Sequence, residues 1–248
     1  MLGVIFDGSF EGFLTIIYKY YYEKLRPCEI VSEQSFQQTL STEYFKIDTD
    51  NAQATKTLNG LREKLSTEIY ERVYLAFVND ETDRYIHIFN YLILCFKHGA
   101  AADGFTQVES VIKTHRYAKN SGHELQLLSG FTRFSETSDG ILYADISPKN
   151  DVMPMLADFF SDRLRGERWV IHDVKRGKAA VFNSSEWIIT DAPEVTAKII
   201  SSAKEKDFQN LWTVFYNTIA IKERTNPKLH RQMKPKRFWK HMTEHQLN

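Results

Sequence analysis

The chain has 248 residues, enough for one large domain or two small ones, with 42% hydrophobic and 26% charged residues, both ordinary for a globular protein. Its two cysteines, Cys28 and Cys95, are too few for a cysteine-rich zinc or iron–sulfur site and provide no disulfide framework. The formal net charge is zero, yet residues 222–241 carry eight Lys or Arg and one Glu, so the other residues sum to seven negative charges.

The first residues predict an N-terminal element and a capped turn. Residues 1–6 are apolar and predict a strand or an extended arm. The sequence Asp7-Gly8-Ser9 predicts a turn in which Ser9 caps a helix that ends at Pro27. No basic leader precedes an apolar run, and the most apolar stretch, 86–96, is far shorter than the roughly 20 residues of a membrane span. We expect a soluble cytoplasmic protein without membrane contact.

The rest of the N-terminal half is predicted to be helical. Residues 41–53 are polar and predict a loop. Apolar residues at helical spacing predict helices over 58–77, with a break near Ser66, over 83–98 and over 105–117.

The second half begins with strand signals. Residues 125–134 and 141–146 predict a hairpin around Ser138-Asp139-Gly140. A helix over 151–165, a hairpin over 169–182 and a short strand over 186–190 follow. The order β-β-α-β-β-β predicts an antiparallel sheet with a helix crossing one face.

A helical, basic C-terminus is predicted after Asp191-Ala192-Pro193. The fold class is therefore α+β. We predict a helical region over 1–121, and over 122–248 an α+β core with its basic C-terminal segment as one compact unit.

The basic segment suggests a polyanion partner, most naturally nucleic acid. Its Lys and Arg side chains can release counterions from phosphates, and Trp239 can stack on an unpaired base. The alternative is a solvated helix whose Trp239 anchors it on the core, and for Trp239 itself we favour the core. The candidate contacts in this segment are Lys228, Arg231, Lys234, Lys236, Arg237, Trp239 and Lys240.

Two further arginines could extend this surface. Arg133 can pair with Asp145 or Asp173 in the sheet, or bind a phosphate through both arms of its guanidinium. Arg176 lies in a predicted hairpin turn, where it is either a phosphate contact or simply solvated.

Asp173-Val174-Lys175 has the acid-x-Lys form of many metal-dependent nucleases, with Asp145 as a second carboxylate. Such a triplet is also frequent by chance, and no third acidic ligand accompanies it. His115, His123 and His172 do not show the spacing of a zinc site, whereas His241 and His245 are four residues apart on a possible helix, a more suggestive spacing. No nucleophile elbow, phosphate loop or dinucleotide motif is present. We therefore predict neither a metal nor a cofactor.

Several segments in order resemble a bacterial family. They are FDGSFEGFLT (6–15), SGFTRF (129–134), GILYADISPKNDVMPMLADFF (140–160), WVIHDVKR (169–176) and TNPKLHRQMKPKRFWKHMTE (225–244). Together they are similar to proteins described as probable DNA metabolism or DNA repair proteins, built on a domain of unknown function.

The resemblance implies a process and partners. Such proteins are encoded beside a radical-SAM protein, and some relatives are fused to a uracil-DNA glycosylase-like domain. This chain lacks the CxxxCxxC cluster motif, so it is not itself the radical enzyme. In two places where the family tends to have histidine, this chain has Gln126 and Phe159.

Three functions follow as hypotheses. The first is a DNA-binding accessory to a radical-SAM partner in DNA repair or DNA metabolism. The second is a metal-dependent nuclease or other DNA-processing enzyme that uses Asp145, Asp173 and Lys175. The third is a protein–protein adaptor whose basic segment binds an acidic surface of a partner protein.

Overall fold

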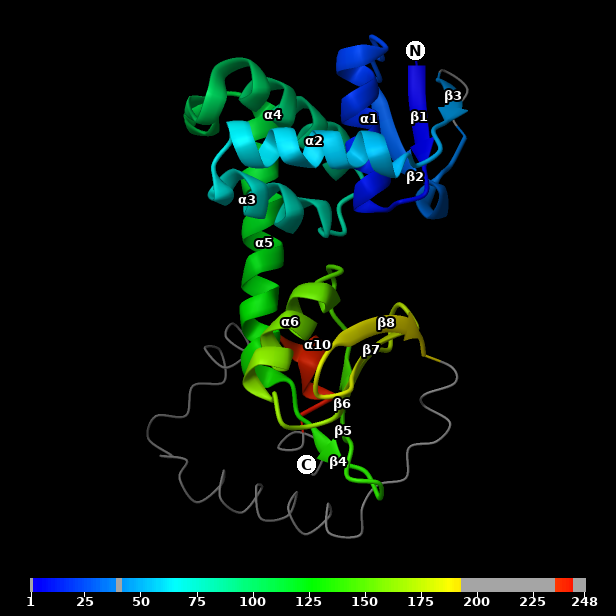
Figure 1. Ribbon diagram of the computed structural model, residues 1–248, viewed down its shortest axis with the longest axis vertical. Coiled ribbons are helices and arrows are strands. Elements are labelled where there is room, and N and C mark those ends of the chain that lie inside the picture. Colours follow the sequence, from blue (N-terminus) through cyan, green and yellow to red (C-terminus); the bar gives the residue numbers. More distant parts are fainter. Residues whose placement is uncertain (1, 39–41, 193–234, 243–248) are drawn as a thin grey trace. The chain divides into compact units, whose positions relative to one another are not determined.

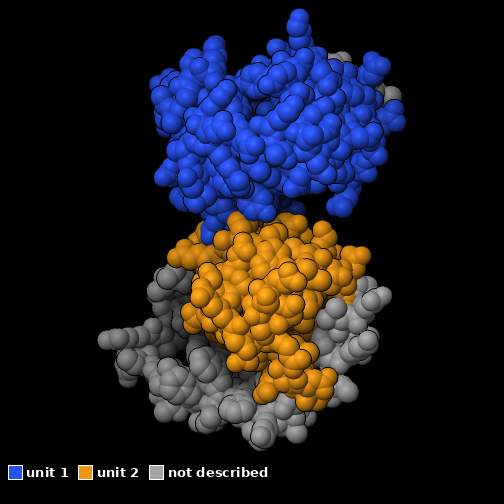
Figure 2. Space-filling view, viewed as in Figure 1, with its two compact units in different colours: residues 1–122 blue, residues 123–248 orange. Residues whose placement is uncertain are grey.

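The computed structural model describes residues 2–38, 42–192 and 235–242. The chain divides into two compact units, residues 1–122 and 123–248, called unit 1 and unit 2 below (Figure 2). The described residues form both helices and strands, which confirms the α+β class. No helix among the described residues is long and apolar enough to cross a bilayer.

Unit 1 contains a parallel three-stranded sheet, so the prediction of an all-helical N-terminal half is wrong. Strand β1 (Leu2–Phe6) lies between β2 (Glu29–Ser32) and β3 (Glu43–Lys46) and runs parallel to both (Figure 1). The two outer strands have only four residues each, which is too short for a clear alternating pattern. β3 also falls in the polar segment that predicts a loop.

The predicted turn and cap after β1 are confirmed. Ser9 is the N-cap of α1 (Phe10–Tyr22), and its hydroxyl accepts a hydrogen bond from the Gly12 amide at 2.9 Å. Asp7 accepts hydrogen bonds from the amide and hydroxyl of Ser9. A side chain at Gly12 would lie 2.5 Å from the Asp7 carboxylate, so the close approach of chain and cap requires glycine here.

The next three helices confirm the helical spacing. They are α2 (Asn51–Lys64), α3 (Thr67–Phe77) and α4 (Arg84–His98), with Ser66 at the predicted break. Short 3-10 turns cover Glu33–Ser35 (η1) and Gly99–Gly104 (η2).

Helix α5 (Glu109–Phe131) is longer than the sequence predicts and replaces the expected strand over 125–134. Its buried residues include Val111, Tyr117, Ala118 and Leu128, which keep helical spacing past Gly122. The apolar run near residue 125 is short and fits either period, so its neighbours in the helix decide its conformation.

Unit 2 is built on a five-stranded sheet in the order β4-β5-β6-β7-β8 (Figure 1). Helix α6 (Met153–Arg163) connects β5 to β6 and packs on β7 and β8, as predicted for the crossing helix. The strands are β4 (Ser135–Glu136), β5 (Leu142–Ile146), β6 (Trp169–Asp173), β7 (Lys178–Phe182) and β8 (Trp187–Asp191).

The sheet is mixed, so the predicted all-antiparallel sheet is wrong at one pair. β5 and β6 are parallel, while the other three pairs are antiparallel. The helix between β5 and β6 returns the chain to the edge of the sheet at which β5 begins. Because of this crossover, β6 runs in the same direction as β5. Gly140 and Gly177 have φ of 70° and 64°, as the two predicted turns require.

The described part of the C-terminus is a short helix, α10 (Lys236–Trp239). Phe238 and Met242 are buried and anchor this segment. The predicted anchor, Trp239, is only half-buried. The predicted helical stretch from 193 to 234 lies outside the described residues.

Candidate functional site

Strand β5 presents a row of polar side chains on one face of the unit 2 sheet. Tyr143 and Asp145 alternate with Ala144 and Ile146, which are buried on the opposite face. Ser147 continues the polar row directly after the strand. The polar row is half-buried, so it combines solvent access with a partly dry environment.

Strand β6 adds a histidine to this row. His172 is the register partner of Asp145, and its Nδ1 lies 2.9 Å from the Asp145 Oδ1 and 2.9 Å from the Tyr143 hydroxyl. The Tyr143 hydroxyl donates to Asp145 Oδ1 at 2.7 Å. The side chain of His172 is 14% exposed and that of Asp145 is 41% exposed.

A third element, far away in the sequence, completes the group. His241, just after α10, places Nε2 2.9 Å from the Ser147 hydroxyl. The charges of Asp145 and His172 both act on the pKa of His241, so the three side chains lie near one another. We call Tyr143, Asp145, Ser147, His172 and His241 the acid–base cluster.

The protonation states of the cluster follow from its geometry. Burial, reinforced by the hydrogen bond to Asp145, raises the pKa of Tyr143 well above its ordinary value, so the phenol stays protonated and donates. With Asp145 as acceptor, His172 Nδ1 carries a proton directed at the carboxylate. In the neutral ring, His172 Nε2 is then an acceptor, the arrangement of a general base held by a carboxylate.

Three exposed lysines accompany the cluster. The Lys175 ammonium donates to the Lys149 carbonyl at 3.2 Å, and Lys149 is two residues from Ser147. Lys240 precedes His241, and its charge helps to lower the pKa of that histidine. We call Lys149, Lys175 and Lys240 the lysine group. Each of these lysines is within three residues of a cluster member along the chain, so the group brings positive charge to the segments that carry the cluster.

Asp173 does not take part in this site. Its register partner is Ile146, so it points to the face opposite Asp145. Its carboxylate is fully buried, accepts the amides of Lys175 and Arg176, and binds the Arg176 guanidinium at 2.8 Å. The two carboxylates of the proposed nuclease motif are therefore not brought together.

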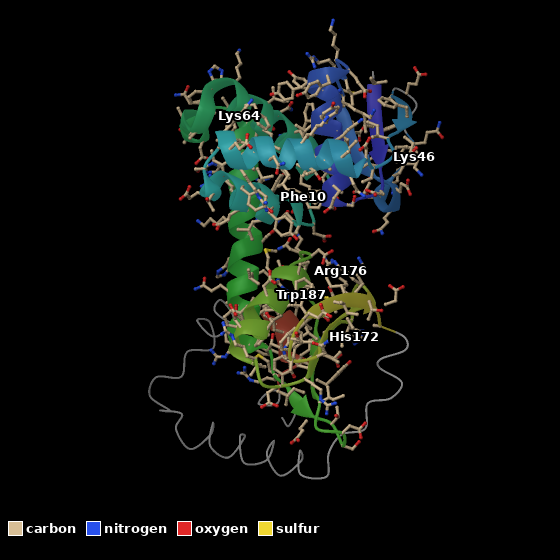
Figure 3. The ribbon with its side chains drawn as sticks, in the orientation of Figure 1. Phe10, Lys46, Lys64, His172, Arg176 and Trp187 are labelled. Atoms are coloured by element: carbon tan, nitrogen blue, oxygen red, sulfur yellow. The ribbon has the colours of Figure 1, made fainter. Side chains whose placement is uncertain are left out.

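Arg176 is held inside the fold instead of facing solvent. Its guanidinium donates to the carbonyls of Pro148 and Lys149 as well as to Asp173, and its side chain is 17% exposed. It fixes the loop after β5 and thereby the position of Ser147 (Figure 3 labels Arg176 and His172). Its role here is to position the loop.

Arg237 makes a comparable structural contact. It binds Glu124 of α5 at 2.6 Å, and this carboxylate is 2% exposed. Glu124 also accepts the amides of Lys149 and Asn150 and the Asn150 side chain. One buried carboxylate thus links the helix, the loop after β5 and the C-terminal segment.

The remaining predicted contacts are scattered. Arg133 follows α5 and donates to the carbonyls of Gly130 and Thr132 at the end of that helix. Lys236 is exposed, as is Lys240. Lys228, Arg231 and Lys234 lie outside the described residues.

Gln126 and Phe159, the two positions at which the chain departs from the family it resembles, are not members of the acid–base cluster. Gln126 is exposed on α5. Phe159 is 38% exposed on α6 and packs edge-on against Phe160. Within residues 2–38, 42–192 and 235–242 no group of three His, Cys, Asp or Glu is arranged to hold a metal ion.

A second polar group, in unit 1, has a structural role. Asp103 accepts hydrogen bonds from Arg72, Tyr91 and His115, which belong to α3, α4 and α5. Burial by itself would raise the pKa of Asp103, but the hydrogen bonds from Tyr91 and His115 and the charge of Arg72 hold it below its ordinary value. The carboxylate joins three helices.

Sequence reasoning named Asp145 but assigned no role to the other four members of the cluster, namely Tyr143, Ser147, His172 and His241. The signal available for β5 was the spacing of Tyr143, Asp145 and Ser147, which a strand places on one face. Nothing in the sequence spacing brings His241 to the same face.

Acidification is expected to loosen the C-terminal segment. Burial, with the Lys240 charge beside it, holds the pKa of His241 below its ordinary value of 6.5, so the folded state binds this proton less readily than the unfolded state. This part of the stability is full above about pH 6.5 and falls as the pH drops through the lowered pKa. Thermal unfolding of the protein and of His241→Gln, from about pH 8 to about pH 5, measures it. We expect a steeper loss in the unaltered protein; parallel profiles would contradict the assignment.

A family model for a domain of unknown function, DUF4130, matches residues 82–244. The match contains all five members of the acid–base cluster. A search of the curated proteins finds no match.

Proposed function

We propose, since the chain belongs to the family described as a domain of unknown function (DUF4130), that it is a DNA-binding protein of DNA repair or DNA metabolism. The observation that carries this proposal is the acid–base cluster with the exposed lysine group beside it. Lysines that contact phosphates release counterions, and each such contact favours binding. The half-buried donors and acceptors among them suit the polar edges of a nucleotide.

The proposed partner is a radical-SAM protein, for which this chain acts as an accessory, with a uracil-DNA glycosylase-like protein as a further partner. The support comes from the ordered segments that resemble the DNA metabolism family. Cys28 and Cys95 cannot hold a cluster of the radical-SAM type, since that needs three cysteines. Radical chemistry would therefore belong to the partner.

Binding of single- and double-stranded DNA across a salt series tests the proposal. We expect binding at low salt and a fall in affinity as salt rises. An adaptor without DNA contact would bind no DNA and would still co-purify with the radical-SAM protein. That outcome would reject DNA binding.

A DNA-processing enzyme is the second candidate, and the Tyr143–Asp145–His172 geometry favours it. A histidine held by a carboxylate, with a protonated phenol beside it, can accept and donate a proton in one step. The reaction class would be general acid–base chemistry on a nucleotide, instead of the metal-dependent cleavage that Asp145 and Asp173 would require.

The His172→Gln variant separates this candidate from a binding role. General acid–base groups contribute about 10²–10⁴-fold to a rate, so we expect a loss of that size in product formation with little change in DNA affinity. The exposed His123 on α5 provides a matched control, His123→Gln. Release of bases or shortened strands is followed by chromatography of the reaction. Equal rates in all three proteins would reject the enzyme.

A further inference from the structure

Unit 1 contains a groove that the site in unit 2 does not use. Its volume is about 630 Å³, within the usual size range of small-molecule sites. The lining comes from α1, α2 and α4. Its aromatic and charged members are Tyr18, Tyr21, Tyr22, Lys56, Glu63, Lys64 and Phe96.

The aromatic side of the groove is an exposed stack. Tyr18 and Tyr22 are four residues apart on α1, and their rings stack with centroids 4.2 Å apart and planes at 21°. Tyr22 is 71% exposed, so most of its surface faces water. Tyr21 is 46% exposed and meets Phe96 edge-on at 5.6 Å. An exposed ring at the end of a stack is a platform on which a planar group can add.

The opposite side of the groove is basic. Lys56 and Lys64 are exposed on α2, and neither forms an ion pair with any residue that the structure describes (Figure 3 labels Lys64). The Lys56 ammonium lies 5.9 Å from the centre of the Tyr18 ring. Glu63 also lines the groove, which leaves a net charge of plus one. The groove thus pairs a planar stacking surface with cations suited to a phosphate.

We propose that this groove binds a nucleotide, with the base stacked on Tyr22 and the phosphate against Lys56 and Lys64. Base–aromatic stacking tolerates any base, because every base has a π face. A free mononucleotide and an unpaired nucleotide within a single strand both present an accessible base face and a phosphate. A duplex hides its base faces and does not fit.

The experiment uses the full chain with Lys149→Ala, Lys175→Ala and Lys240→Ala, so that contacts of the lysine group do not contribute. Thymidine monophosphate, an oligothymidylate of about eight nucleotides and a duplex of the same length are titrated separately. We expect the oligothymidylate to bind more tightly than the duplex, either alone or together with thymidine monophosphate. The mononucleotide arm decides whether the free or the strand-bound nucleotide is the source.

Two substitutions with opposite expected effects on nucleotide affinity test whether this groove is the binding site. Tyr22→Leu removes the platform and is expected to weaken binding about tenfold, a typical loss for one stacked base. Glu63→Gln removes the repelling charge and is expected to strengthen it. Tyr70→Leu, outside the groove, serves as the matched control and should leave binding unchanged. Absence of binding to every probe, or equal affinities in Tyr22→Leu and Tyr70→Leu, would overturn the proposal while leaving the function proposed for unit 2 intact.

Discussion

Replacing Glu124 with Gln is expected to lower the free energy of unfolding of unit 2 by about 3 kcal/mol. The carboxylate is buried and serves four donors, namely the amides of Lys149 and Asn150, the Asn150 side chain and the Arg237 guanidinium. A glutamine offers one acceptor oxygen where the carboxylate offers two, so at least one buried donor loses its partner. Denaturant unfolding measures the loss.

The exposed Glu167, also in unit 2, provides the matched control. Glu167→Gln is expected to change stability by no more than about 0.5 kcal/mol. Arg237→Ala should cost less than Glu124→Gln, because the guanidinium is 44% exposed and Glu124 keeps its three other donors. Equal stabilities of the Glu124 and Glu167 variants would show that the carboxylate does not connect α5 to the loop and to the C-terminal segment.

Replacing Asp173 with Ala is expected to destabilise unit 2 by about 3–5 kcal/mol. The change removes the buried carboxylate 2.8 Å from the Arg176 guanidinium, leaving the more distant carboxylate of Asp151 at 3.9 Å, and it removes the acceptor for the amides of Lys175 and Arg176. Asp173→Asn should cost less, since an amide oxygen can still accept from both amides. Circular dichroism during thermal unfolding follows the loss.

This prediction distinguishes a structural carboxylate from a metal ligand. Lys175→Ala, which changes the other residue of the acid-x-Lys triplet, is expected to stay within about 0.5 kcal/mol of the unaltered protein. Asp162, whose side chain is 76% exposed, gives the surface control Asp162→Ala. If Asp173→Ala kept full stability, the buried ion pair with Arg176 would not support the fold.

The helices of unit 1 could be predicted because their pattern is local. The apolar spacing over 58–98 depends only on residues a few positions apart. The same is true of the turns of unit 2 at Gly140 and Gly177. The conformation of residues 125–131 could not be decided that way. It depends on the burial of Leu128 and its neighbours as a continuation of α5.

The direction of strands depends on where the connecting helix returns the chain. Residues 141–182 predict strands and a helix at nearly the observed positions, but the parallel pairing of β5 with β6 comes from the packing of α6 on β7 and β8. The same pairing sets Asp145 beside His172 and turns Asp173 away. The sequence hypothesis joined Asp145 and Asp173 in one site, whereas this pairing places their side chains on opposite faces of the sheet.

The role of the basic residues was likewise only partly predictable from the sequence. Sequence reasoning names most Lys and Arg residues of the C-terminal segment as phosphate contacts, yet charge alone does not show which of these side chains bind buried carboxylates inside the fold. The guanidinium groups of Arg237 and Arg176 bind Glu124 and Asp173, two buried carboxylates, and the side chains of Lys240, Lys149 and Lys175 lie at the surface. Lys149 and Lys175 lie outside the segment of highest charge, and Lys149 is not among the residues named from the sequence.

The proposed function depends on contacts between the lysine group and DNA phosphates. The salt dependence of single-stranded DNA binding, compared between the unaltered protein and the variant with Lys149→Ala, Lys175→Ala and Lys240→Ala, tests it most directly. Each lost phosphate contact lowers the slope of log affinity against log salt by about 0.7, so we predict a slope smaller by about 2. Equal slopes and equal affinities in the two proteins would show that these lysines do not contact DNA phosphates.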